Sequence, residues 1–264
     1  MKNLKVTLIQ SNIIWENRDA NLEKFSAGLK EINDNPDLII LPEMFATGFT
    51  MNVEKCAERE DGDTVNFLKE MAQKKNCVIT GTVLIEESGK YFNRLFWMRP
   101  DGSYETYDKR HLFRMGKEHL TMSQGTERKI VELNVWKINL QICYDLRFPV
   151  WSKNRYNDGD YEYDLLIYVA NWPQVRSSAY KALIPARAIE NQCYTIWANR
   201  VGLDGNNVFH SGDSMICDPY GKIVSQADAG KEQIISQILS KQKLEEFRKK
   251  FTVGTDWDEF SIVK

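Results

Sequence analysis

The chain has 264 residues, 42% of them hydrophobic and 27% charged, and a formal net charge of −2. A chain of this length can bury a large hydrophobic core, and its near-neutral charge excludes a general attraction to nucleic acid or to anionic membranes. No stretch approaches the roughly 18 to 20 apolar residues that span a bilayer, and the amino terminus lacks the apolar region of a signal peptide. We therefore expect a cytoplasmic protein with no nucleic-acid partner and no membrane partner.

The five cysteines are scattered, and they form no C-x-x-C pair and have no histidine at metal-ligand spacing. This pattern argues against a disulfide framework and against a zinc site, so most of them are expected to be small core residues. No linker rich in Pro, Gly or Ser interrupts the sequence. We predict one domain over residues 1–264, with a tail from about 240 that packs on the domain or on a partner subunit.

The first third of the chain alternates between strand and helix patterns. Residues 4–12 predict a short strand, and an amphipathic helix with an Asn or Asp cap follows it. The continuous apolar run 36–44 predicts a strand covered on both faces. Pro42 ends that strand, so Glu43 lies at its carboxyl end. A second amphipathic helix is predicted over 63–75.

Strand patterns dominate the middle of the chain, where the predicted strands and hairpins are 77–87, 91–109, 128–145 and 163–173. A Pro-Asp-Gly sequence within the second segment predicts a hairpin turn. The pattern from Ser178 to Gln192 is helical, although Pro185 should kink it. Further strands follow, and a charged helix is predicted over 240–251. Many strands with helices outside them indicate stacked sheets between helical layers.

Cys143 ends a strand-like run, where it is either a core residue or a nucleophile. A free thiol has a pKa of about 8.5 and needs a base or a cationic environment to react. None of the three histidines lies in a papain-like or caspase-like context, and Glu43 is an alternative base. Local sequence alone leaves two readings open for each residue: Cys143 in the core or reactive, and Glu43 as a cap or as a base.

Five motifs in order carry a family resemblance: LPEM (41–44), YDKRHLF (107–113), CYDLRFP (143–149), VANWP (169–173) and ARAIENQ (186–192). Together they resemble the nitrilase, or carbon–nitrogen hydrolase, superfamily over about residues 4–224. The resemblance implies an α+β fold, a four-layer α-β-β-α sandwich, with no metal, no cofactor and a homodimeric assembly. Within the superfamily the chain looks most like the omega-amidase branch, which hydrolyses the terminal amide of 2-oxo acids such as 2-oxoglutaramate.

The resemblance also implies roles for individual residues. Cys143 would attack the amide carbon, and Glu43 would receive the thiol proton as general base. Lys109 and the backbone N–H of Tyr144 would stabilise the oxyanion. Glu118, seven residues before a glycine, would orient Lys109 and the substrate amide, the alternative being an ordinary surface glutamate.

Substrate-binding residues are predicted with less support from the motifs. Arg176 is our candidate for holding a substrate carboxylate, because planar guanidinium groups bind carboxylates in a bidentate manner. Arg147 is a weaker candidate and is expected to form a structural ion pair with Asp145 or another carboxylate. The candidate pocket walls, for each of which plain core packing is the alternative, are Phe45, Phe113, Trp172 and Phe209.

The tail residues Trp257, Phe260 and Ile262 fit a segment that docks on a partner subunit or on its own subunit. Three other functions stay open: another carbon–nitrogen hydrolase (a nitrilase, a carbamoylase or an amidase of aliphatic or aromatic amides), a non-catalytic adaptor with the same fold, and a redox sensor that uses Cys143.

Overall fold

The computed structural model describes residues 2–262, and two six-stranded sheets form the centre of this part of the chain. The first sheet has the order β16-β1-β2-β3-β4-β5, and its strands are β1 (Leu4–Gln10), β2 (Leu38–Ile40), β3 (Val78–Glu87), β4 (Lys90–Met98), β5 (Tyr104–Asp108) and β16 (Gln233–Leu239). The second has the order β15-β14-β11-β10-β7-β6, and its strands are β6 (Ile130–Leu133), β7 (Trp136–Ile142), β10 (Leu165–Ala170), β11 (Tyr194–Asn199), β14 (Met215–Cys217) and β15 (Ile223–Gln226).

Two short strand pairs lie outside these sheets: β8 (Tyr156–Asn157) with β9 (Asp160–Tyr161), and β12 (Val201–Leu203) with β13 (Phe209–Ser211). The helices are α1 (Arg18–Glu31), α2 (Val53–Cys56), α3 (Asp63–Lys75), α4 (Glu118–Thr121), α5 (Pro149–Ser152), α6 (Ser177–Asn191) and α7 (Lys241–Lys250). Short 3-10 turns are η1 (Arg114–Gly116), η2 (Cys143–Arg147), η3 (Gln174–Arg176) and η4 (Val253–Asp256).

Alternation along the strands of the first sheet builds two separate cores. In β2, Leu38 and Ile40 join the core that the first sheet shares with the second. Ile39 points the other way and packs with Phe25 of α1 and Leu68 of α3. Because successive side chains of a strand point to opposite faces, a continuous apolar run such as this one must be covered on both sides.

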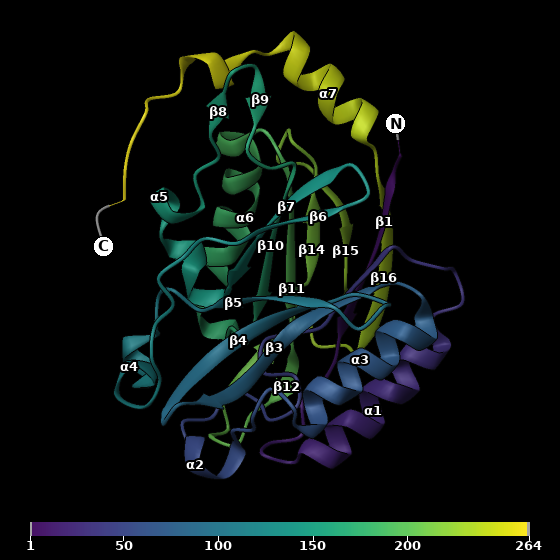
Figure 1. The fold of residues 1–264 in the computed structure, drawn as a ribbon, viewed down its shortest axis with the longest axis vertical. Coiled ribbons are helices and arrows are strands. Elements are labelled where there is room, and N and C mark those ends of the chain that lie inside the picture. The colour runs from purple at the N-terminus through teal and green to yellow at the C-terminus, as the bar shows by residue number, and fades with distance from the viewer. Residues whose placement is uncertain (1, 263–264) are drawn as a thin grey trace.

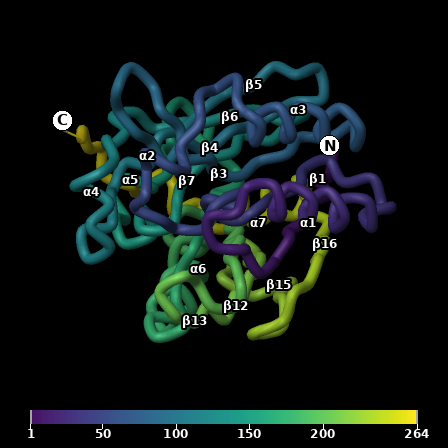
Figure 2. Tube along the Cα trace, turned by 90° about the horizontal axis from the view of Figure 1, so that it is seen from below, coloured from purple at the N-terminus to yellow at the C-terminus, as the bar shows by residue number. Residues whose placement is uncertain are grey.

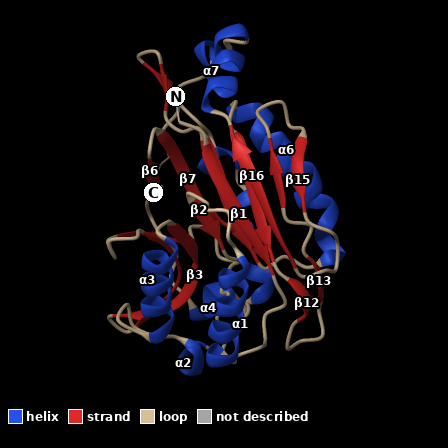
Figure 3. Ribbon diagram, turned by 90° about the vertical axis from the view of Figure 1, so that its right-hand side faces the viewer, coloured by secondary structure: helices blue, strands red, loops and turns tan. Residues whose placement is uncertain are grey.

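The four predicted layers are present. Figure 1 shows α1 and α3 side by side against the first sheet, and Figures 2 and 3 place α6 on the other side of the molecule, over the second sheet. Tyr180, Ile184 and Ala188 are the residues of α6 that enter the core of the second sheet. Pro185 lies inside α6, as the sequence predicts.

Strand directions determine where functional side chains gather. β1, β2 and β3 are parallel, and β5 runs in the same direction because two antiparallel pairings separate it from β3. In the second sheet β7 and β10 are parallel. The carboxyl ends of β2, β5, β7 and β10 are followed directly by segments that meet between the two sheets, the usual place for a site in sheets of parallel strands.

The carboxyl-terminal part differs from the sequence prediction in one strand. Residues 233–239, for which no element is predicted, form β16 and pair antiparallel with β1 along its length. The tail after α7 docks on its own chain, where the Trp257 ring meets Tyr161 edge-on and lies under the Lys153 ammonium. Figure 1 shows this tail passing β8 and β9 and ending beside α5.

Among the described residues, no helix is long and apolar enough to cross a membrane.

Candidate active site

Glu43 lies just beyond β2, where the chain turns sharply. Pro42 ends the strand, and Met44 adopts a left-handed backbone with φ +47° that the Thr82 hydroxyl holds by accepting the Met44 N–H at 2.7 Å. The Glu43 side chain is fully buried, and its Oε2 accepts the backbone N–H of Asn171 at 2.8 Å. The strand end therefore directs a carboxylate between the two sheets rather than to the surface.

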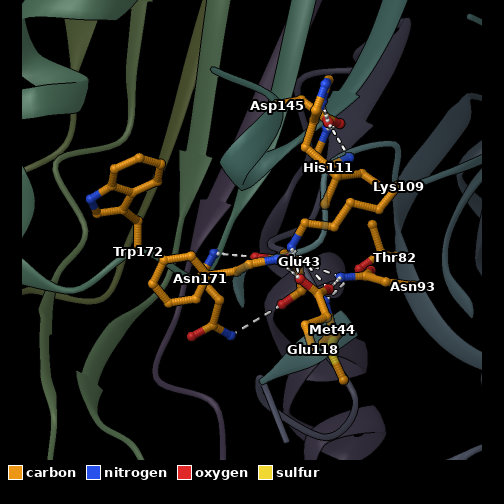
Figure 4. Close-up of polar contacts among 12 residues, drawn as sticks. Glu43, Met44, Thr82, Asn93, Lys109, His111, Glu118, Asp145, Asn171 and Trp172 are labelled. Carbon is orange, nitrogen blue, oxygen red and sulfur yellow. Dashed lines mark hydrogen bonds and ion pairs between the residues drawn. The ribbon is translucent and has the colours of Figure 1, made fainter. Parts of the chain in front are cut away.

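Lys109 follows β5 and is also buried. Its Nζ donates to Glu43 Oε1 at 2.8 Å and to Glu118 Oε1 at 3.0 Å. Burial alone would lower the pKa of Lys109, but the charges of Glu118 and Glu43 outweigh it and raise the pKa above its ordinary value. The ammonium is therefore a fixed positive charge in the site (Figure 4).

Glu118 begins α4 and is fully buried, which excludes the surface alternative. Its Oε2 accepts the backbone N–H of Phe113 at 2.6 Å. Burial raises the pKa of Glu118, and the charge of Glu43 adds to this against the opposing charge of Lys109. Gly125 closes the segment, because its N–H donates to Lys109 O at 2.9 Å and an added Cβ would lie 2.1 Å from Asp108 O.

Cys143 is the first residue of η2, and its backbone has φ +43°. The residue is 8% exposed and lines a pocket beside Lys109 and Asn171. Burial and then the charge of Glu43, which also hydrogen bonds with the thiol, raise the pKa of Cys143 well above its ordinary value, with Lys109 opposing. The resting thiol is thus protonated and has a carboxylate placed to take its proton.

Asp145 fixes the turn that carries Cys143. Its Oδ1 accepts the backbone N–H of His111 at 3.0 Å and lies 2.7 Å from His111 Nδ1, and its Oδ2 accepts the Tyr107 hydroxyl at 2.7 Å and the Ile142 N–H at 3.0 Å. The sequence predicts that Arg147 pairs with Asp145 or another carboxylate, and the Asp145 part of this prediction is wrong, because both oxygens of Asp145 make the contacts given above. The Arg147 guanidinium lies instead over the Trp172 ring, 5.0 Å from its centroid.

The pocket above Cys143 has a volume of about 570 Å³, within the range of small-molecule sites. Arg176, Phe113 and Trp172 line it, as do Tyr144 and the 204–210 segment. The Arg176 guanidinium lies 5.0 Å from the centroid of Phe113, and the Trp172 indole N–H donates to Arg176 O at 3.0 Å. Burial lowers the pKa of Arg176, while the charge of Cys143 would raise it and that of Arg147 would lower it.

The structure thus brings Glu43, Lys109, Glu118 and Cys143 together, with Tyr144, Arg176, Phe113 and Trp172 around the same pocket. Two candidate walls do not line it. Phe45 packs between Phe25 and Phe67 in the core under α1 and α3, because the turn at Met44 sends it to the opposite face from Glu43. Phe209 is 41% exposed, and its neighbours Val208 and His210 face the pocket instead.

Sequence reasoning missed two asparagines of the site. Asn171 lies within the VANWP motif but has no predicted role, and its N–H and side-chain amide donate to Glu43 Oε2 and Glu43 O at 2.8 and 3.3 Å. Asn93 of β4 donates to both carboxylates. In the sequence, only the position of Asn93 at the end of the predicted hairpin, opposite Lys109, could have indicated this role. In the described part of the chain no group of three or more His, Cys, Asp or Glu could hold a metal ion.

The model of the carbon–nitrogen hydrolase family matches residues 5–249. The chain therefore belongs to the carbon–nitrogen hydrolase family. It is 45% identical over 262 residues to the omega-amidase YafV of Escherichia coli strain K12, covering 99% of this chain and all of that protein. It is 30% identical over 255 residues to the 2-oxoglutaramate amidase of Bacillus subtilis, covering 95% and 96% of the two chains.

Solved structures agree with this assignment. A CN-hydrolase superfamily protein from Xanthomonas campestris, described with an arsenic adduct in its active site, matches over the whole of both chains with a TM-score of 0.97 and 41% identity. Nit3 of Saccharomyces cerevisiae, a member of the nitrilase superfamily, matches with a TM-score of 0.81 and 26% identity over 95% and 94% of the two chains. The predicted nitrilase-type fold is confirmed.

Proposed function

We propose that this protein is an amidase that hydrolyses the terminal carboxamide of a 2-oxo acid, such as 2-oxoglutaramate, to a carboxylate and ammonia. The observation that carries the proposal is the convergence of Cys143, Glu43 and Lys109 at a pocket whose wall also holds Arg176. The names of the omega-amidase and 2-oxoglutaramate amidase relatives support the substrate class.

In the first half-reaction the Cys143 sulfur bonds to the amide carbon while Glu43 takes the thiol proton. The amide oxygen becomes an oxyanion, which Lys109 Nζ and the Tyr144 N–H would stabilise. Tyr144 lies in the first turn of η2, where backbone N–H groups have no partner within the turn. Each such donor contributes about 3 to 4 kcal/mol to the transition state.

Collapse of this intermediate breaks the carbon–nitrogen bond as Glu43 returns its proton to the leaving nitrogen, so ammonia departs and a thioester remains. A water molecule then attacks the thioester and loses its proton to Glu43. The carbon–sulfur bond breaks, the carboxylate forms, and the proton returns to Cys143. A single carboxylate can serve both half-reactions, because each half-reaction leaves it unprotonated.

The pocket supports an acidic substrate. Two cations, Lys109 and Arg176, and two carboxylates, Glu16 and Asp204, line it. The Arg176 guanidinium is partly buried against Phe113. A carboxylate at the far end of the substrate would pair with it in a bidentate manner. A cytoplasmic location and a homodimer belong to the same proposal, the homodimer by analogy with the superfamily.

Ammonia release from a panel of substrates tests the proposal. We expect turnover of 2-oxoglutaramate and succinamate, weak turnover of a nitrile and an N-carbamoyl amino acid, and none with Cys143→Ala. Glu43→Gln should lower kcat by about 100-fold or more, since general base catalysis is typically worth 10²–10⁴. If neither 2-oxoglutaramate nor succinamate releases ammonia but another substrate does, the protein is a different member of its family. No ammonia release from any substrate would favour an adaptor. Full activity of Glu43→Gln would contradict the mechanism.

A further inference from the structure

Asn93 is a fully buried side chain of β4 that touches both carboxylates of the site. Its amide nitrogen donates to Glu43 Oε1 at 2.8 Å and to Glu118 Oε1 at 3.2 Å. Lys109 Nζ donates to the same two oxygens at 2.8 and 3.0 Å. Two donors therefore bridge the same pair of oxygens, one charged and one neutral, as Figure 4 shows.

The charge of this cluster explains why a neutral donor is needed. Two carboxylates share one ammonium, so the ionised cluster has a net charge of −1 in a buried space. Burial raises the pKa of Glu118 and the charge of Glu43 adds to this, so a charged Glu43 disfavours ionisation of Glu118. An amide NH₂ stabilises both without adding a second cation that would hold the Glu43 proton acceptor too strongly.

The orientation of the Asn93 amide is kept at a cost. Its Oδ1 is buried and has no hydrogen-bond partner among the described residues. An unsatisfied buried acceptor costs about 1–3 kcal/mol. The opposite orientation would direct that oxygen at both Glu43 and Glu118, which is worse. The carboxylates therefore determine how this side chain lies.

Asn93 also holds Lys109 through the backbone, because its carbonyl oxygen accepts the Lys109 N–H at 3.0 Å. This bond continues the β4–β5 pairing by one residue beyond Arg94 and Asp108. A single strand position thus contacts all three charged members of the cluster.

We propose that Asn93 is a positioning residue that holds the Glu43 carboxylate, together with Glu118, in the geometry that accepts the Cys143 proton. The inference rests on the proposed function, because the proposed mechanism assigns Glu43 as the base. It predicts that the hydrogen-bond donor of Asn93, rather than its volume, determines the rate.

Two substitutions separate these properties. Asn93→Asp keeps the shape but adds a third carboxylate, which can donate a hydrogen bond only when protonated. We expect its kcat to fall by about 100-fold at pH 8 and to recover partly as the pH is lowered, so that the pH optimum moves to the acid side. Asn93→Ala removes the donor and should lower kcat by about 10- to 100-fold at every pH, with KM little changed.

Asn154→Ala is the matched control. Asn154 is equally buried, and its amide donates to Tyr163 O and Asn191 O at 2.9 and 3.0 Å, outside the pocket lining. This variant should lose stability in urea unfolding but keep the wild-type kcat and pH profile per folded molecule. A wild-type pH profile for Asn93→Asp, or a loss of rate no larger than its unfolded fraction, would overturn the inference.

The rate of Cys143 alkylation by iodoacetamide keeps this test separate from the proposed function, because it needs no substrate. We expect alkylation of Asn93→Asp to be slower than that of the wild type at a given pH, since a third carboxylate disfavours the thiolate. If the wild type hydrolyses no amide but alkylation distinguishes the variants in this way, the proposed function fails and the role of Asn93 stands. Equal alkylation rates would count against Asn93.

Discussion

Cys143 has a backbone conformation that few residues other than glycine adopt. A non-glycine residue at φ +43° carries strain of about 1–3 kcal/mol, and such residues persist only where the surroundings hold them. Met44, next to the second reactive side chain, has φ +47°. The two sharp turns direct Cys143 and Glu43 from separate sheets toward each other, which regular strand or helix continuation would not do.

At the scale of single residues, replacing Arg176 tests whether this side chain selects acidic over neutral amides. Arg176→Gln should raise the KM for an acidic amide by about 10- to 100-fold, because a hydrogen bond to a charged group is worth about 1.5–3 kcal/mol. The KM for a neutral aliphatic amide should change little. Steady-state kinetics on the two substrates measure this difference. Arg147→Gln is the comparison, because Arg147 is not among the pocket-lining residues and its guanidinium lies over the Trp172 ring. An equal effect on both substrates would assign Arg176 to packing alone.

At the scale of elements, turn η2 depends on four contacts to the two oxygens of Asp145. Asp145→Asn would direct an NH₂ group at donors that now meet an acceptor, and we expect it to cost about 1–3 kcal/mol of unfolding free energy and to lower kcat at least 10-fold. Urea unfolding and initial rates measure both.

Tyr107→Phe provides the graded comparison, because it removes only one of those contacts. Its losses should be the smaller of the two in both measurements. Losses from Tyr107→Phe as large as those from Asp145→Asn would show that the Tyr107 hydroxyl, which also accepts the Trp151 indole N–H and the Arg110 N–H, holds the turn as much as the carboxylate does.

The elements with strong patterns were predictable, and the reasons are local. The 3.6-residue spacing indicates α1 and α3, the continuous apolar run indicates β2, and the Pro-Asp-Gly turn indicates the β4–β5 hairpin. Strand β16 was missed because its half-exposed sequence has no continuous apolar run. Its pairing with β1 depends on a partner more than two hundred residues away, which no local window contains.

The same limit applies to the site. Glu43, Lys109, Glu118 and Cys143 could be predicted because each belongs to a recognisable motif of the superfamily. The sequence leaves Phe45 open between pocket wall and core. The left-handed backbone at Met44, which has no marker in a non-glycine residue, directs it to the core. Asn93 belongs to none of the five motifs, and only the pairing of β4 with β5 brings it beside Lys109.

At the scale of the whole molecule, buried His210 links stability to pH. Burial, followed by the charge of Arg200, lowers the pKa of His210 to about 4, from 6.5. Between these values the unfolded chain binds more protons than the folded one, so stability is complete above pH 6.5 and falls as the pH drops toward 4. At pH 5 this loss amounts to about 2 kcal/mol.

Urea unfolding at pH 7.5 and pH 5 measures that loss. His210→Gln should lose about 2 kcal/mol less stability than the wild type between the two pH values. His119→Gln, measured at the same two pH values, is the control for replacing a histidine. An unchanged pH dependence in His210→Gln would mean that this side chain is solvated in the folded protein.

The pairing of β1 with β16 has a consequence for how the protein forms during synthesis. Leu4 faces Leu239 in the pairing of β1 with β16. Strand β1 therefore gains its outer neighbour in the sheet only after almost the entire chain has been synthesised. Until then β1 is an unprotected sheet edge with apolar side chains on both faces, which is a template for association with other chains. A nascent chain that stalls before residue 233 would expose that edge on the ribosome. Strand β16 therefore protects this edge from association with other chains, although it holds none of the proposed catalytic residues.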